Sequence, residues 1–60
     1  MNRLKTIESG TIWRVDDIDS GSVVRSADVK IEIYPNWVCI KQLPTDIWVP
    51  RELVEQIHGN

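Results

Sequence analysis

The sequence has very few of the residues that stabilise small domains by covalent or metal links. It contains one cysteine, Cys39, and one histidine, His58, among 60 residues. A single cysteine excludes an internal disulfide, and this pair is too few for a structural zinc site built from four Cys and His side chains. A chain this short buries only a small core. We therefore expect one domain over residues 1–60, stabilised by its own packing or by association.

Long apolar segments are also missing. The longest unbroken apolar run covers residues 37–40, whereas a membrane-spanning helix needs about 20 residues. The first nine residues carry two basic side chains but no apolar core of the kind found in signal peptides. Together with the lone cysteine and an isoelectric point near 5.1, these features predict a cytoplasmic protein without membrane contact.

Motifs that carry catalysis or bind cofactors are absent from the sequence. The three glycines are isolated from one another, so no glycine-rich phosphate loop is present. The acidic turn at residues 16–22 lacks the glycine that a calcium loop needs at its sixth position. Cys39 is expected beside Trp48 in an apolar strand, which raises a thiol pKa, so we expect no nucleophile–base pair with His58. The sequence predicts a protein that is not an enzyme, with no catalytic residue, metal or cofactor.

β-branched residues dominate the apolar part of the composition. There are eight Ile and seven Val, but only three Leu and one Ala. β-branched side chains fit a pleated sheet and lose rotamer freedom in helices. The aromatic residues are three Trp and one Tyr, which favour half-exposed positions and interfaces. This composition predicts a sheet-rich domain with an aromatic surface.

Hydrophobic alternation and turn residues define the expected elements. The expected strands are 11–15, 23–25, 28–34, 37–42 and 45–49. Segment 50–58 is expected to be a helix, because Pro50 suits a first turn and the apolar residues from Leu53 to Ile57 are spaced as a helical stripe. The predicted fold class is α+β, a small antiparallel β-meander of three to five strands with one C-terminal helix. An SH3-like small β-barrel is the alternative.

Two predicted hairpins assign the same register to the middle strand of the meander. A turn centred on residues 35–36 places Ile31 opposite Ile40, and a turn centred on residues 43–44 places Ile40 opposite Ile47. Both hairpins therefore assign Ile40 to one aliphatic face. The residues expected on this face are Val29, Ile31, Ile33, Val38, Ile40, Ile47 and Val49.

The opposite face of the meander collects aromatic and polar side chains. Its expected cross-strand pairs are Tyr34 with Trp37, Glu32 with Cys39, Cys39 with Trp48, and Lys41 with Asp46. Two Trp and one Tyr lie on a surface that the single predicted helix does not cover. The partner-binding residues predicted from this face are Tyr34, Trp37, Cys39, Lys41 and Trp48.

Three interpretations of this face compete. In the first, N-terminal strands with Trp13 and Val15 cover it as a second core layer. In the second, it is an interface with a second copy or another protein, where Trp and Tyr are enriched. In the third, bases of single-stranded nucleic acid stack on it. The net charge of -2 disfavours phosphate binding, so we predict a protein-interaction or regulatory module that forms a homodimer, with single-stranded nucleic-acid binding as the alternative.

Residues 29–58 also resemble part of a known family. The segments Trp37-Val-Cys-Ile and Ile47-Trp-Val-Pro-Arg-Glu are similar to the strand–strand–helix end of the single-strand-binding transcriptional cofactors. The resemblance implies a dimeric, curved sheet backed by a C-terminal helix, with basic and aromatic groups on its open face. The chain departs from that family in its few lysines and net negative charge. In length and economy, it also resembles the short accessory reading frames of temperate phages and prophages.

Overall fold

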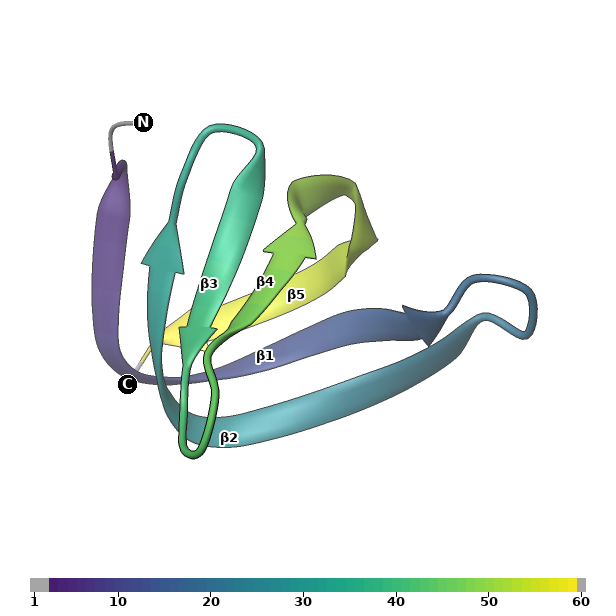
Figure 1. Ribbon diagram of the computed structural model, residues 1–60, viewed down its shortest axis with the longest axis horizontal. Helices are drawn as coiled ribbons and strands as arrows, with labels where there is room; N and C mark the ends of the chain where they lie inside the picture. The colour runs from purple at the N-terminus through teal and green to yellow at the C-terminus, as the bar shows by residue number, and fades with distance from the viewer. Residues whose placement is uncertain (1–2, 60) are drawn as a thin grey trace.

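The computed structural model describes residues 3–59 and contains one antiparallel sheet with the strand order β4-β3-β2-β1-β5 (Figure 1). The elements are β1 (Lys5–Asp17), β2 (Ser22–Ile33), β3 (Trp37–Lys41), β4 (Ile47–Pro50), the 3₁₀ turn η1 (Arg51–Leu53) and β5 (Val54–Gly59). Strands β4 and β5 form the two edges of the sheet, and η1 connects them. None of the helical structure within residues 3–59 is long and apolar enough to cross a membrane.

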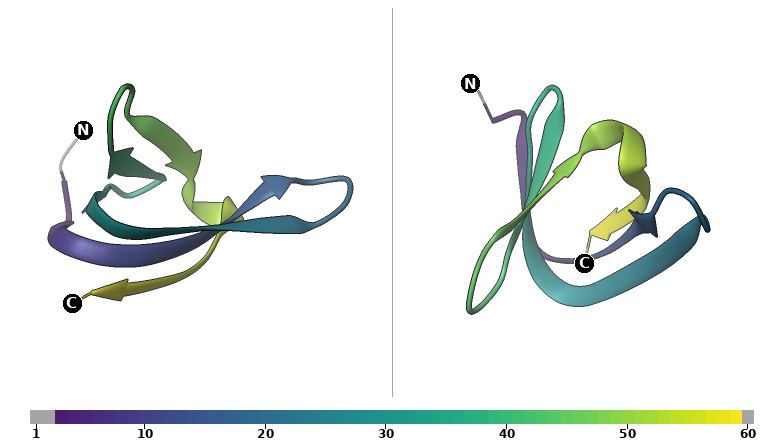
Figure 2. Two further views of the ribbon diagram at one scale, coloured as in Figure 1. Left: turned by 90° about the horizontal axis from the view of Figure 1, so that it is seen from below. Right: turned by 45° about the vertical axis from the view of Figure 1, so that its right-hand side comes forward.

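Strands β1 and β2 form a long hairpin that bends in its middle (Figures 1 and 2). The ladder shifts in β1 between Ile7 and Gly10, and it shifts again where β2 passes Asp28, which has a φ of 56°. Each shift leaves an extra residue in one of the two strands. Such β-bulges bend a strand and increase its twist. Aspartate adopts the left-handed backbone conformation more readily than most residues. The two halves of the hairpin therefore run in different directions, and the sheet curves around its inner side.

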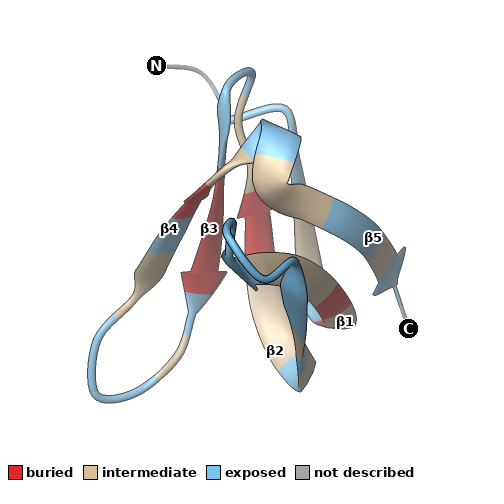
Figure 3. Ribbon diagram, turned by 90° about the vertical axis from the view of Figure 1, so that its right-hand side faces the viewer, coloured by how far each residue is buried: buried red, intermediate tan, exposed pale blue. Residues whose placement is uncertain are grey.

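The core lies on the inner side of the curved sheet, and its buried residues come from β1, β2, β3 and β4 (Figure 3). The buried members are Ile12, Ile31, Val38, Ile40 and Val49, and the partly buried residues packed against them are Ile7, Val29, Ile33, Ile47, Leu53, Val54 and Ile57. The expected register is confirmed, since Ile31 pairs with Ile40 and Ile40 pairs with Ile47. Every residue predicted on the aliphatic face belongs to the core or packs against it.

The structure contradicts the α+β class and the C-terminal helix. Residues 3–59 contain five strands and a single 3₁₀ turn, so the protein is all-β. Residues 51–53 form this turn, and residues 54–59 form β5, which pairs with β1. The helix implied by the resemblance to the single-strand-binding cofactors is therefore replaced by a strand. The small-barrel alternative is also all-β, but no ladder between β4 and β5 closes the described part of the sheet.

A β-bulge explains why the C-terminal segment has the pattern of a helix. Between two adjacent residues of β1, the ladder in β5 steps from Gln56 to Val54 and leaves Glu55 as an extra residue. The extra residue moves Val54 to the face that Ile57 occupies, and both side chains pack on the core. Apolar residues three positions apart are typical of a helix face, but here an irregular strand produces the same spacing.

Candidate functional site

The outer face of β3 and β4 carries two exposed tryptophans. Alternate residues of a strand point to opposite sides, so Trp48 points outward while its neighbour Val49 is buried in the core. Trp37 is 38% exposed and Trp48 is 53% exposed. Tyr34 lies beside Trp48, with 5.4 Å between the ring centroids. We call Tyr34, Trp37 and Trp48 the aromatic face.

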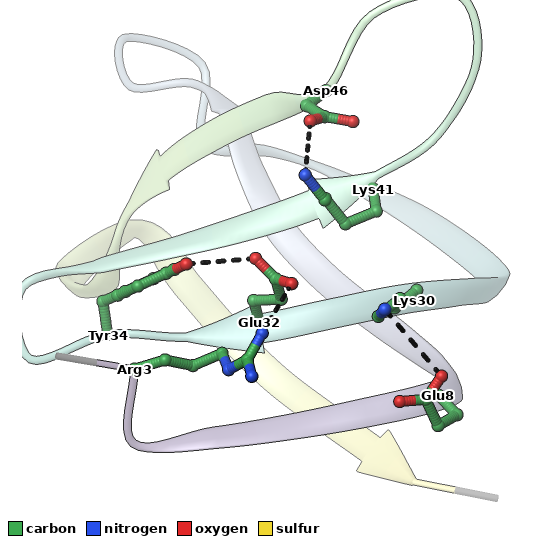
Figure 4. A network of polar contacts seen from close by, with 7 residues as sticks. All are labelled: Arg3, Glu8, Lys30, Glu32, Tyr34, Lys41 and Asp46. Atoms are coloured by element: carbon green, nitrogen blue, oxygen red, sulfur yellow. Dashed lines mark hydrogen bonds and ion pairs between the residues drawn. The ribbon is translucent and has the colours of Figure 1, made fainter.

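A polar network holds Tyr34 in this position (Figure 4). The Tyr34 hydroxyl donates a hydrogen bond to Oε1 of Glu32 at 3.0 Å, and Nη1 of Arg3 donates to Oε2 at 3.0 Å. Burial acts to raise the pKa of Glu32, but the hydrogen bond from Tyr34 and the charges of Lys41 and Arg3 outweigh it and lower this pKa. Burial and the bond to Glu32 raise the pKa of Tyr34. At neutral pH the network therefore joins an ionised carboxylate to a protonated hydroxyl.

Cys39 and Lys41, the other predicted partner-binding residues, have different environments. Cys39 stands opposite Glu32 and Trp48 in the ladder, but it is 0% exposed. Burial raises the pKa of its thiol, so Cys39 supports the aromatic face from within and presents no surface to a partner. Lys41 lies at the periphery, where Nζ donates a hydrogen bond to Oδ2 of Asp46 at 2.8 Å. The accessible part of the predicted site is therefore its three aromatic rings and the paired Lys41.

Three cations on the outer face of the sheet are paired with carboxylates (Figure 4). The pairs are Arg3 Nη1 with Glu32 Oε2 at 3.0 Å, Lys41 Nζ with Asp46 Oδ2 at 2.8 Å, and Lys30 Nζ with Glu8 Oε1 at 4.0 Å. Phosphate binding depends on Lys and Arg side chains that exchange counterions for phosphate oxygens. Here a carboxylate already occupies the position beside each cation. These three cations therefore already have carboxylate partners and do not form a basic groove beside the aromatic face.

A groove adjoins the aromatic face where β3 begins. It has a volume of about 440 Å³ and is lined by Pro35, Asn36, Trp37, Pro50, Arg51 and Glu52. Trp37 pairs with Pro50 in the ladder, and the N–H of Arg51 donates a hydrogen bond to the carbonyl of Asn36 at 3.1 Å. These contacts join the two walls of the groove. The sequence did not predict this groove, because its second wall falls in the segment expected to be a helix.

Trp13 lies away from the aromatic face. Its ring meets the ring of His58 edge to face at 5.2 Å, and the guanidinium of Arg25 lies over it at 5.8 Å from the centroid. Val15, on the same strand, pairs with Val23 in the hairpin. The interpretation in which Trp13 and Val15 cover the aromatic face as a second core layer is therefore wrong. His58 itself lies in β5, which β1 and β2 separate from the strand of Cys39.

The candidate site thus consists of three rings, a buried carboxylate network and an adjoining groove. Residues from β2, β3, β4 and η1 contribute to it, and the register of the two hairpins brings them together. Comparison of the chain with models of protein families, with curated proteins and with solved structures found no match.

Proposed function

We propose that the protein is a small, non-enzymatic interaction module that binds a partner protein through the aromatic face. The observation that carries the proposal is the exposure of Trp37 and Trp48 on adjacent strands, beside a tyrosine that is fixed by hydrogen bonding. Large aromatic side chains contribute most of the binding energy in many protein interfaces. Rings that are already held in place lose little conformational freedom on binding.

The charges around the aromatic face favour a protein partner over single-stranded nucleic acid. Bases stack on aromatic rings, but this binding also requires a positively charged groove that follows the backbone. Arg3 and Lys41 are paired with Glu32 and Asp46, and the lowered pKa of Glu32 keeps its negative charge at neutral pH. Phosphate groups beside the rings would therefore meet the carboxylates of Glu32 and Asp46, with which Arg3 and Lys41 are already paired.

A second copy of the chain is the partner we expect first. Trp48 lies in β4, which is an edge strand of the sheet. Two copies that pack their aromatic faces together at this end of the sheet would cover both exposed tryptophans. The small core of a 60-residue chain also gains stability from association. We therefore expect a dimer whose melting temperature rises with protein concentration.

The two classes of partner are separated by tryptophan fluorescence. A mixed-sequence single-stranded oligonucleotide is titrated into the protein at low salt, and dilution of the protein alone is followed in parallel. We expect no quenching by the oligonucleotide and a concentration-dependent change on dilution. Micromolar quenching that disappears in Trp48→Ala would instead identify the face as a nucleic-acid platform. Leu43→Ala is the matched control, because Leu43 is 93% exposed and lies in the turn of the same hairpin.

A further inference from the structure

Strand β1 has an open edge along its first half. On one side, β2 pairs with β1 from Lys5 onward, whereas on the other side β5 pairs with it only from Gly10 to Arg14. In Figure 1, β5 ends beside the bend of β1, and the first half of β1 continues beyond it. Within residues 3–59, segment 5–9 therefore has a partner strand on a single edge. Backbone N–H and C=O groups on such an edge are available to another strand.

Gly10 lies where β5 meets the open half of β1. A Cβ at this position would lie 2.6 Å from the carbonyl oxygen of His58 and 2.8 Å from Cγ2 of Ile7. The absence of a side chain therefore allows β5 to approach β1 closely at Gly10. Gly59, the last residue of β5, pairs with Gly10. Beyond this glycine pair, the edge of β1 lacks a described neighbour.

An apolar groove runs beside the open edge. It has a volume of about 490 Å³ and is lined by Lys5, Thr6, Ile7, Glu8, Ile33, Ile57 and Gly59. Ile7, Ile33 and Ile57 belong to the partly buried residues that pack on the core. An added strand on this edge would extend the sheet and place every second side chain against these isoleucines. The groove therefore offers an apolar contact next to unpaired backbone groups.

We propose that this edge accepts a short extended segment of a partner protein as an added strand, antiparallel to β1 and in line with β5. The pattern of the segment follows from β1. Alternation places Lys5 and Ile7 on one side and Glu8 on the other. The segment therefore needs an apolar residue opposite Ile7 and an acidic residue opposite Lys5, whereas Glu8 already has Lys30 as its ion-pair partner. Lys5 forms no ion pair with any residue from 3 to 59. Its charge is therefore available to the segment.

The charges of the edge favour a different chain over a second copy of this one. If two copies paired their open edges antiparallel about Ile7, Lys5 would meet Ser9, and Thr6 would meet Glu8. This arrangement supplies no carboxylate for Lys5. A separate segment with the pattern apolar, any, acidic supplies a carboxylate for Lys5. This site lies apart from the aromatic face and does not depend on it.

The probe is a synthetic peptide, acetyl-Thr-Lys-Val-Thr-Glu-Thr-amide, which carries this pattern. It is titrated into ¹⁵N-labelled protein and followed by NMR. We expect amide shift changes at residues 5–9 and 57–59 that saturate with a Kd below about 1 mM, together with slower hydrogen exchange at residues 5–9. Trp48→Ala should bind the peptide as the unaltered protein does. Absence of saturable binding, or shifts confined to Trp37 and Trp48, would overturn the proposal.

Two further comparisons separate strand addition from non-specific contact. Lys5→Glu should weaken binding about two- to fivefold, and a peptide with Lys in place of Glu should restore it, because Lys5 is exposed and the change reverses one charge. Two further peptides keep the same side chains but carry N-methyl groups on alternate backbone nitrogens. One is methylated at the odd positions and the other at the even positions. Only one of them should lose binding, since a strand donates to β1 from alternate residues. Equal binding of both, or no effect of the charge reversal, would contradict an added strand.

Discussion

The ring of Tyr34 is inclined by 37° to the ring of Trp48, with 5.4 Å between the two centroids. This arrangement depends on Glu32, which accepts the hydrogen bond from the Tyr34 hydroxyl. A buried carboxylate thus determines the position of an aromatic side chain at the surface. The aromatic face is therefore ordered before any partner arrives, which lowers the entropy lost on binding.

Removal of the Tyr34 hydroxyl should raise the pKa of Glu32. Tyr34→Phe keeps the ring beside Trp48 but deletes the hydrogen bond that favours the ionised carboxylate. NMR titration of the Glu32 side-chain carboxyl measures the change directly. Trp48→Ala is the control, because it removes the neighbouring ring and leaves the hydroxyl in place. An unchanged Glu32 pKa in Tyr34→Phe would show that the hydroxyl does not stabilise the charge.

Stability should fall in acid partly through Glu32. Its pKa in the folded state is below the ordinary value of 4.5, so its ionised form stabilises the fold above that value. This contribution is lost as the pH falls from about 4.5 through the lowered pKa. Urea unfolding between pH 7 and pH 3 should therefore show a steeper loss for the unaltered protein than for Glu32→Gln. Parallel pH profiles for the two proteins would contradict this role of Glu32.

Truncation of Ile40 should destabilise the whole domain. Ile40 is 0% exposed and pairs with Ile31 on one side and Ile47 on the other. Ile40→Ala should lower the free energy of unfolding by about 2–5 kcal/mol, which chemical denaturation followed by circular dichroism measures. Leu43→Ala should change it by less than about 0.5 kcal/mol. Equal stability of the two variants would contradict the central position of Ile40.

A methyl group at Gly10 should disrupt the junction of β1 and β5. Its Cβ would approach backbone and side-chain atoms at 2.6 and 2.8 Å, so the strands must move apart. Gly10→Ala should cost about 1–3 kcal/mol of stability and speed hydrogen exchange in β5. Gly59→Ala is a matched control, since its Cβ would meet no atom closer than 3.6 Å. If both variants unfold at the same denaturant concentration, the close approach at Gly10 is not required.

The meander from β2 to β4 could be predicted because its pattern is local. Pro35 and Pro44 fall in its two turns, and alternating isoleucines assign the face of each strand. A shift of one residue would have exposed the aliphatic side chains. The pairs with Ile40 and the outward tryptophans therefore followed from the sequence alone.

The rest of the fold depends on irregular strands that alternation does not reveal. The expected strands 23–25 and 28–34 are one strand, β2, and the gap between them falls at the bulge near Asp28. Strand β1 is likewise longer than the expected 11–15. In β5, the extra residue Glu55 produced a helical spacing, and pairing with β1 overrode it. Bulges add residues without changing composition, so only long-range pairing shows them.

Part of the candidate site could be predicted for the same reason. The hairpin register placed Tyr34, Trp37 and Trp48 on one face, and the exposure of the two tryptophans agrees with an aromatic surface. The same register placed Cys39 there, but its small side chain lies buried among larger ones. The groove at Pro50 depends on η1, which the expected helix concealed.

Sedimentation equilibrium of the unaltered protein, Trp48→Ala and Leu43→Ala across a wide concentration range tests the interaction module most directly. The proposal predicts a dimer at micromolar concentration, weakened by about 2 kcal/mol or more in Trp48→Ala and unchanged in Leu43→Ala. Circular dichroism of each sample verifies that the sheet is intact. A protein that stays monomeric at every concentration, or a folded Trp48→Ala variant that dimerises as well as the unaltered chain, would contradict association through the aromatic face.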